Sequence, residues 1–180
     1  AEAAASLALR DGRPEGLGFY LDQQRIHAGT DETSLRDALD GWQTDRAAGL
    51  DAVMLAGTRD QVAQLNQWAR QHCLTTTGCT IQGPVAVLSD GNLASVGDVI
   101  VTRLNDRRLS ISATDWVKNG DRWTVTGVDP AGAIHAHHLH TGLRITLPPT
   151  YVTENVELGY AVTVHGAQGI TVDTTHTVLT

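Results

Sequence analysis

One short segment in the first half of the chain constrains the fold most, because an apolar run is followed there by a tight turn and a helical pattern. Ala52–Ala56 is apolar throughout, as is typical of a strand buried on both faces of a parallel sheet. Thr58 and Gln61 have the spacing of a capping box at the start of a helix predicted over residues 59–71. Strand, polar turn and helix form the unit of parallel α/β folds, so this part is predicted to be α/β.

Three further helices are predicted before this segment. An Ala- and Leu-rich stretch over residues 1–10 ends at Gly12, and a weaker helical spacing covers residues 14–24. The third helix is predicted over residues 34–48, with Ser34 as its N-cap. These elements supply apolar faces that can cover a sheet.

The sequence changes character after residue 75, where short strands replace long helices. Turn residues separate these strands, which are predicted at residues 85–88, 98–104, 123–128, 133–139 and 143–147. Several short antiparallel strands at close spacing indicate a small barrel of the SH3 or OB type. We therefore expect a partial parallel-sheet domain over residues 1–78 plus 153–180, interrupted by an inserted β-barrel over residues 84–150.

The four tryptophans fit this division. Trp42 and Trp68 lie on predicted helix faces and are expected in the core, although aromatic side chains can also stack on nucleic-acid bases. Trp116 and Trp123 flank Asn119-Gly120, a dipeptide that favours a two-residue β-hairpin. Cross-strand packing of these two indoles is the simpler expectation.

Composition limits what the chain can do alone. Its single lysine, Lys118, does not stand in a G-x-x-x-x-G-K-[ST] loop, and its adjacent acidic pair, Asp31-Glu32, follows no apolar strand. Neither Walker motif is therefore expected, and the chain carries half of an ATPase at most. A net charge of −7 is unlike most nucleic-acid binders, but motor domains also hold single strands through hydroxyls, amides and a few arginines. No apolar run or signal pattern predicts a membrane segment.

Metal binding and thiol chemistry are weakly supported. Cys73 and Cys79 have a spacing that fits neither a zinc knuckle nor a C-x-x-C motif, so reduced thiols are expected. A histidine-rich stretch alternates along a predicted strand, so that each face offers two imidazoles where zinc needs three or four ligands; its members are His135, His137, His138 and His140. We predict no metal site and no catalytic residue.

Residues 159–173, GYAVTVHGAQGITVD, resemble motif V of RecD-like superfamily 1 helicases, Y-A-x-T-V-H-[KR]-A-Q-G-x-T-V-D. Thr163 and His165 can donate hydrogen bonds to phosphate oxygens, and the resemblance implies contacts with DNA. Gln168 and Gly169 form a turn that can approach a nucleotide closely. Gly166 departs from the motif, because the family usually carries Lys or Arg there.

The strand and helix at residues 52–66 resemble helicase motif IV, an apolar strand followed by [AP]-x-T-R and, further on, L-N. The resemblance implies that Thr58 and Asn66 contact DNA and that Arg59 contacts the nucleotide. The alternative is structural: Thr58 is only a helix cap, and Arg59 is a solvated residue of the first helical turn.

Residues 96–109 resemble G-D-x-V-x-x-x-x-N-D-R-x-L, a segment of the inserted barrel in conjugative relaxase–helicases of the TraI, TrwC and TraA type. Arg107 and Arg108 lie in this segment, and the resemblance is compatible with their guiding the DNA strand. A solvated hairpin end is an equal alternative for both arginines.

These resemblances together imply a partial second RecA-like domain of an ATP-dependent 5′→3′ DNA helicase, most similar to that of a conjugative relaxase. Its partners would be single-stranded DNA, the first RecA-like domain of the parent chain and, in conjugation, secretion coupling proteins, in the cytoplasm and without membrane contact. ATP and Mg²⁺ would bind in the complete parent protein and not to this fragment alone. The chain lacks an initiator Met and ends within a predicted strand, as expected of a piece of a longer protein. The alternative is a non-catalytic barrel that recruits protein or binds DNA in a decayed helicase.

Overall fold

The computed structural model describes residues 1–76 and 83–179 of the 180-residue chain. It divides into two compact units, Ala1–Asp37 and Ala38–Thr180. Within the described ranges, no helix combines the length and apolar character needed to cross a bilayer.

The first unit is built on a pair of short helices, α1 (Glu2–Arg10) and α2 (Gly16–Asp22). The prediction of α1 is confirmed, and Gly12 follows it with a left-handed φ of +72°. Helix α2 is shorter than predicted. It packs closely on α1 at Gly16, where a Cβ atom would lie 2.6 Å from the carbonyl oxygen of Ala5. Glycine is therefore required at this helix contact.

Helix α3 (Asp31–Ala47) begins three residues before the predicted start at residue 34. Thr30 precedes the helix, and its hydroxyl accepts a hydrogen bond from the backbone N–H of Thr33 at 3.3 Å. Ser34 lies inside the first turn. The correction has a local cause, because a threonine upstream supplies the cap that we assigned to Ser34.

A parallel sheet of three strands forms the base of the second unit, in the order β11 (Ala161–Thr163), β1 (Ala52–Ala56) and β12 (Thr174–Val178). The predicted strand, turn and helix are confirmed: β1 leads into α4 (Arg59–Thr76). The capping box is confirmed as well. The N–H of Thr58 donates to Gln61 Oε1 at 3.2 Å, and the N–H of Gln61 donates to Thr58 Oγ1 at 3.3 Å.

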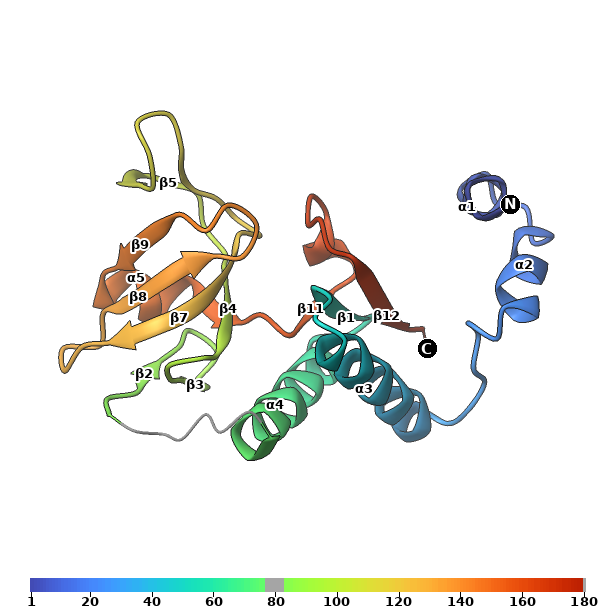
Figure 1. Cartoon of the computed structure of the whole chain (residues 1–180), viewed down its shortest axis with the longest axis horizontal. Coiled ribbons are helices and arrows are strands. Elements are labelled where there is room, and N and C mark those ends of the chain that lie inside the picture. The colour runs from blue at the N-terminus through green and yellow to red at the C-terminus, as the bar shows by residue number, and fades with distance from the viewer. Residues whose placement is uncertain (77–82, 180) are drawn as a thin grey trace. The chain divides into compact units, whose positions relative to one another are not determined.

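The two faces of this sheet are covered differently. Helices α3 and α4 lie side by side against it (Figure 1), and Trp42 of α3 is only 1% exposed, with its indole N–H donating to the Ala52 carbonyl at 3.1 Å. This confirms the prediction that Trp42 is a core residue; Trp68 is half-buried on α4. On the other face, Val53 and Val162 pack with Val101 of the barrel.

The inserted segment is a barrel of short antiparallel strands, shown in green to orange in Figure 1. Its five-stranded sheet has the order β10 (Val156–Leu158), β4 (Val99–Thr102), β7 (Arg122–Val128), β8 (Ile134–His138) and β9 (Arg144–Leu147). Two ribbons complete it: β2 (Ala86–Val87) with β3 (Leu93–Ala94), and β5 (Asp106–Ser110) with β6 (Trp116–Val117). A short helix, α5 (Pro149–Asn155), leads into β10. Each of the five predicted strands is found; four have shorter bounds, and β7 begins one residue earlier than predicted.

The predicted hairpin at Asn119-Gly120 is wrong. The turn exists, with Gly120 at a φ of +91°, but the strands on either side of it do not pair: β6 pairs with β5, and β7 pairs with β4 and β8. Arg107 Cζ instead lies over Trp116, 4.9 Å from the ring centroid. Trp123 packs edge-on against His138, with the two ring centroids 4.8 Å apart. Each indole found a partner on another strand, so the two do not face each other.

The barrel ends later than the predicted boundary at residue 150. Strand β10 pairs with β4, so the barrel sheet continues to Leu158. Gly159 then passes so close to β4 that a Cβ atom would lie 2.8 Å from the carbonyl carbon of Ile100. In the part of the chain that the structure describes, no barrel strand pairs with the parallel sheet.

Candidate nucleic-acid interface

The two motifs that resemble helicase segments meet at the carboxyl-terminal edge of the parallel sheet. Ala56 at the end of β1 is in register with Thr163 at the end of β11, and the Val164 N–H donates to the Ala56 carbonyl at 3.1 Å. Thr58 therefore begins α4 beside the turn that carries His165. Ligands of open parallel sheets bind outside this edge, so the two motifs lie where a ligand is expected.

Thr163 ends β11, and His165 begins a single 3₁₀ turn, η1 (His165–Ala167); the two residues differ in exposure. Thr163 is half-buried, and its Oγ1 accepts a hydrogen bond from the Gly166 N–H at 3.0 Å. A hydroxyl has one proton and two lone pairs, so this contact leaves the Thr163 proton free to donate to a ligand. His165 is exposed beside it. The turn thus presents one oriented hydroxyl and one imidazole to solvent.

Thr58 acts as the N-cap of α4, as the structural alternative proposed. The cap uses one lone pair of the hydroxyl and leaves its proton available, so capping and phosphate contact are compatible. Arg59 is exposed in the first turn, also as that alternative proposed.

Asn66 does not lie at this surface, although the resemblance assigned it to DNA. It is 2% exposed, and both its amide oxygen and its amide nitrogen bond to the backbone at the start of β11. Its Oδ1 accepts from the N–H groups of Tyr160 and Ala161, at 3.1 and 2.8 Å, and its Nδ2 donates to the Ala161 carbonyl at 3.0 Å. Asn66 therefore holds β11 against α4.

The predicted nucleotide contacts are not assembled at one place. Arg59 follows the carboxyl end of β1, and Gln168 is exposed just after η1. Gly169, however, lines a cavity of about 120 Å³ together with Asp51, which precedes the other end of β1. Five strand residues span about 16 Å, so Gly169 and Arg59 are associated with opposite ends of that strand.

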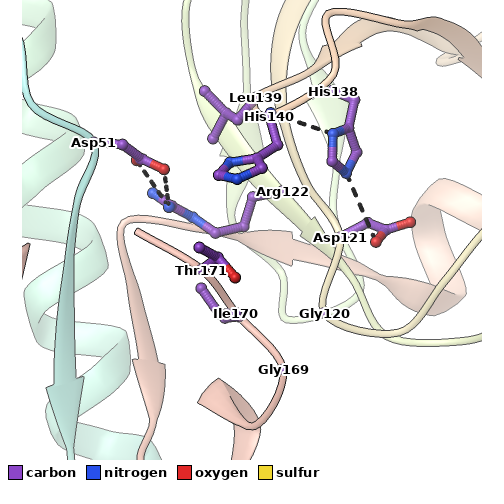
Figure 2. A pocket seen from close by; sticks show the side chains of 10 residues that line it. All are labelled: Asp51, Gly120, Asp121, Arg122, His138, Leu139, His140, Gly169, Ile170 and Thr171. Atoms are coloured by element: carbon purple, nitrogen blue, oxygen red, sulfur yellow. Dashed lines mark hydrogen bonds and ion pairs between the residues drawn. The ribbon is translucent and has the colours of Figure 1, made fainter. Parts of the chain in front are cut away.

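That cavity is formed where the barrel meets the sheet, and Figure 2 shows its lining. The barrel contributes His138 and Asp121, whose side chains approach to 3.7 Å. Arg122 and the segment after η1, at Gly169, also line it. The polar groups of the lining are directed largely at each other.

Arg122 makes the first of two buried joints between barrel and sheet. Its side chain is 5% exposed, and its Nη1 donates to Asp51 at 2.9 Å. The remaining nitrogens donate to the carbonyls of Gly159 and Ala52, at 3.2 and 3.3 Å. Burial lowers the pKa of the guanidinium, and the charge of Asp51 opposes this shift. One barrel arginine thus pins the start of β1 and the connection to β11.

Asp98 makes the second joint. It is 3% exposed, and its Oδ2 accepts from Arg70 of α4 at 3.0 Å and from the Ser95 N–H at 2.7 Å. Its Oδ1 accepts from the Tyr160 hydroxyl at 2.7 Å. Burial and the Asp98 charge raise the pKa of Tyr160, so this phenol stays a neutral donor. Sequence reasoning missed both joints, because their partners are far apart in the chain.

Arg107 and Arg108 lie on the β5–β6 ribbon of the barrel and not at the sheet edge. Arg107 stacks on Trp116, whereas Arg108 is 89% exposed at its side chain and pairs with Asp106 at 2.7 Å. The ribbon is solvated, and Asp106 and Asp115 balance its two arginines, so residues 106–117 carry no net charge.

The remaining candidates do not form a metal centre among the described residues, where no group of three or more suitable side chains gathers. His135 lies against Thr146, with Nδ1 and Oγ1 2.9 Å apart. Cys73 is half-buried on α4, and Cys79 lies outside the described residues.

Comparison with known proteins identifies the barrel. Residues 86–157 match the family described as Rv2311 SH3-like barrel domain, which decides between the two barrel types in favour of SH3. Two relatives from Mycobacterium tuberculosis, "Uncharacterized protein Rv2311" of strain H37Rv and "Uncharacterized protein MT2373" of strain CDC 1551, are each 42% identical over 73 residues. The match covers 40% of this chain and 42% of each relative, so the chain spans less than half the length of these relatives.

Among solved structures, one entitled "Structural Basis for DNA Unwinding at Forked dsDNA by two coordinating Pif1 helicases" aligns with a TM-score of 0.42 and 14% identity. The alignment covers 79% of this chain and 39% of that one. A superposition this loose assigns no shared fold. The chain is therefore described as a mixed α/β protein with a parallel sheet and an SH3-like barrel.

Proposed function

We propose that this chain is part of the second RecA-like domain of an ATP-dependent 5′→3′ DNA helicase, as found in conjugative relaxases, and that it contacts single-stranded DNA. The observation that carries the proposal is the register between the ends of β1 and β11. It brings the Thr58 turn and the Thr163–His165 turn, two separate motif resemblances about a hundred residues apart, to one edge of a parallel sheet.

The chemistry of this edge suits a phosphate backbone. Two threonine hydroxyls retain a proton for donation, and His165 offers an exposed imidazole. Contacts of this kind position a strand without reading its bases, so the proposal predicts binding with little sequence preference. It also accommodates a net charge of −7, because few phosphates need to be neutralised.

In this proposal, the nucleotide binds to the complete parent protein and not to this chain alone. ATP hydrolysis supplies the free energy for strand movement, and Arg59 and Gln168 are the exposed residues of this chain that would face the nucleotide. Lys118 cannot replace a P-loop lysine, since it lies in the barrel and pairs with Asp115 at 2.6 Å. ATP and Mg²⁺ would therefore be held mainly by the first RecA-like domain, and we expect the isolated chain to hydrolyse no ATP.

The proposal is tested with the double substitution Thr163→Ala/His165→Ala, assayed by fluorescence anisotropy with a labelled dT15 oligonucleotide. Each lost contact to phosphate costs about 1.5–3 kcal/mol in a sheltered site and less in a wet one, so binding should weaken at least severalfold. The melting temperature of the same sample corrects for folding. Unchanged affinity per folded molecule would defeat the proposal.

A second function is favoured by one observation: the match to a sequence family is confined to the barrel. In this alternative, the barrel recruits a protein, such as a secretion coupling protein, or binds DNA itself through the β5–β6 ribbon. The substitution Arg107→Ala/Arg108→Ala distinguishes the two. It should leave dT15 binding nearly unchanged if the sheet edge is the site, and abolish binding if the ribbon is.

A further inference from the structure

Arg103 is a barrel residue whose guanidinium lies beside the η1 turn. It follows β4 directly, and its backbone N–H donates to the Asn155 carbonyl at 2.8 Å. Its Nε donates to Glu157 Oε2 at 2.6 Å, and its side chain is 23% exposed. The guanidinium is therefore held in one orientation by a carboxylate on the neighbouring strand, β10.

The other end of this guanidinium faces Gly166. A Cβ atom added at Gly166 would lie 3.4 Å from Arg103 Nη1 and 2.9 Å from Thr163 Oγ1. Gly166 does not have a left-handed φ; a side chain there would meet Thr163 Oγ1 most tightly and would make ordinary contact with the guanidinium. Glycine leaves room for a cation from the barrel beside the Thr163 hydroxyl.

We propose that Arg103 is a phosphate-binding residue that completes an anion site at the end of β11, together with the Thr163 hydroxyl and the His165 imidazole. The ligand class is the phosphodiester backbone of single-stranded nucleic acid. The inference rests on the proposed function, and it adds that the barrel itself supplies the cation. Glu157 engages Nε, which leaves N–H groups of the Nη atoms for a phosphate oxygen.

A structural role for Arg103 makes different predictions. In that view the Arg103–Glu157 pair, whose side chains are 23% and 35% exposed, only fastens β4 to β10. Removing either partner should then have the same effect. In a phosphate site the two partners act in opposite directions, because Glu157 repels the ligand that Arg103 attracts.

The experiment measures dT15 affinity of the 180-residue chain over a salt series, with Arg103→Ala, Glu157→Gln and Arg144→Ala. Arg103→Ala should weaken binding about tenfold and reduce the slope of log K against log salt by about 0.7, as expected for one lost contact to a single strand. Glu157→Gln should tighten binding about two- to threefold, because glutamine still accepts from Nε but lacks the charge. Arg144 lies on β9, at the opposite edge of the barrel sheet, and its replacement should change neither quantity appreciably.

A rescue variant sharpens the test. In Arg103→Ala/Gly166→Lys, the lysine side chain has the space that the guanidinium vacated, so it should restore the salt slope, while the contact of its Cβ with Thr163 Oγ1 keeps part of the affinity loss. Gly166→Lys alone should weaken binding, because its side chain meets Arg103 and the Thr163 hydroxyl.

Two results would overturn the inference alone: an Arg103→Ala variant with unchanged affinity and slope while Thr163→Ala/His165→Ala weakens binding, or equal losses in Arg103→Ala and Glu157→Gln that follow their melting temperatures. Failure of the rescue variant to regain the slope would also overturn it. If the unmodified chain does not bind dT15 at low salt, the inference and the proposed function both fail.

Discussion

The buried joints and the exposed sheet edge use similar polar side chains in opposite ways. At the joints, Asp98 and Arg122 are nearly inaccessible, as is Asn66 between α4 and β11, and the polar atoms of all three have partners within the chain. At the edge, Thr58 and Thr163 are only partly engaged and keep a hydroxyl proton for a ligand. A buried polar group needs hydrogen-bond partners within the protein, whereas an exposed group can keep a donor or acceptor for a ligand. Completeness of pairing, more than residue type, separates structure from candidate function here.

The largest expected effect belongs to a joint. Asp98→Ala leaves the guanidinium of Arg70 and the Tyr160 hydroxyl without their buried acceptor, so it should reduce the free energy of unfolding by about 3–5 kcal/mol. Urea denaturation measures the change. Glu154→Ala, an exposed carboxylate on α5 of the same barrel, is the matched control and should stay within about 0.5 kcal/mol. Equal urea midpoints for Asp98→Ala and Glu154→Ala would show that Asp98 does not hold the barrel to the parallel-sheet part.

An intermediate effect is expected at Asn66. Asn66→Ala removes three hydrogen bonds to the strand entering β11, and the stability loss should be about 2–3 kcal/mol. Its affinity for dT15 per folded molecule should not change, because the side chain is buried. The exposed neighbour Gln67→Ala is the control. A loss of dT15 affinity at unchanged melting temperature would instead show that Asn66 contacts DNA.

Features that depend on residues close together in the chain could be predicted from the sequence, and contacts between distant residues could not. The β1 strand, the Thr58–Gln61 capping box and the barrel strands were predictable, because local periodicity and spacing determine them. Their long-range partners were not. Asn66 meets Ala161 through tertiary packing, and its position in a motif gave no sign of burial.

Long-range contacts were also missed within the barrel and at the carboxyl-terminal edge of the parallel sheet. Nothing near Trp116 in the sequence indicates that β6 pairs backward with β5 and not forward across Asn119-Gly120. Arg103 and Gly166 lie 63 positions apart, so their contact was invisible until the chain was folded. The departure of Gly166 from the motif was visible, but its neighbours in the fold, the Thr163 hydroxyl and the Arg103 guanidinium, were not.

The smallest effect on stability is expected at the edge, with Thr58→Asp. Aspartate is as good an N-cap as threonine, so the free energy of unfolding should stay within about 0.5 kcal/mol. The added negative charge should nevertheless weaken dT15 binding severalfold by repelling phosphate. Thr58→Ser serves as the control and should retain both stability and binding. Unaltered binding in Thr58→Asp would leave Thr58 with its capping role alone.

The central claim is that nucleic acid binds at the joined ends of β1 and β11, and hydrogen–deuterium exchange with and without saturating dT15 tests it most directly. We predict slower exchange of backbone amides in peptides that cover residues 57–62 and 161–168. Exchange in the β5–β6 ribbon, residues 106–117, should stay the same. Protection confined to that ribbon, or binding without protection at the sheet edge, would contradict the account.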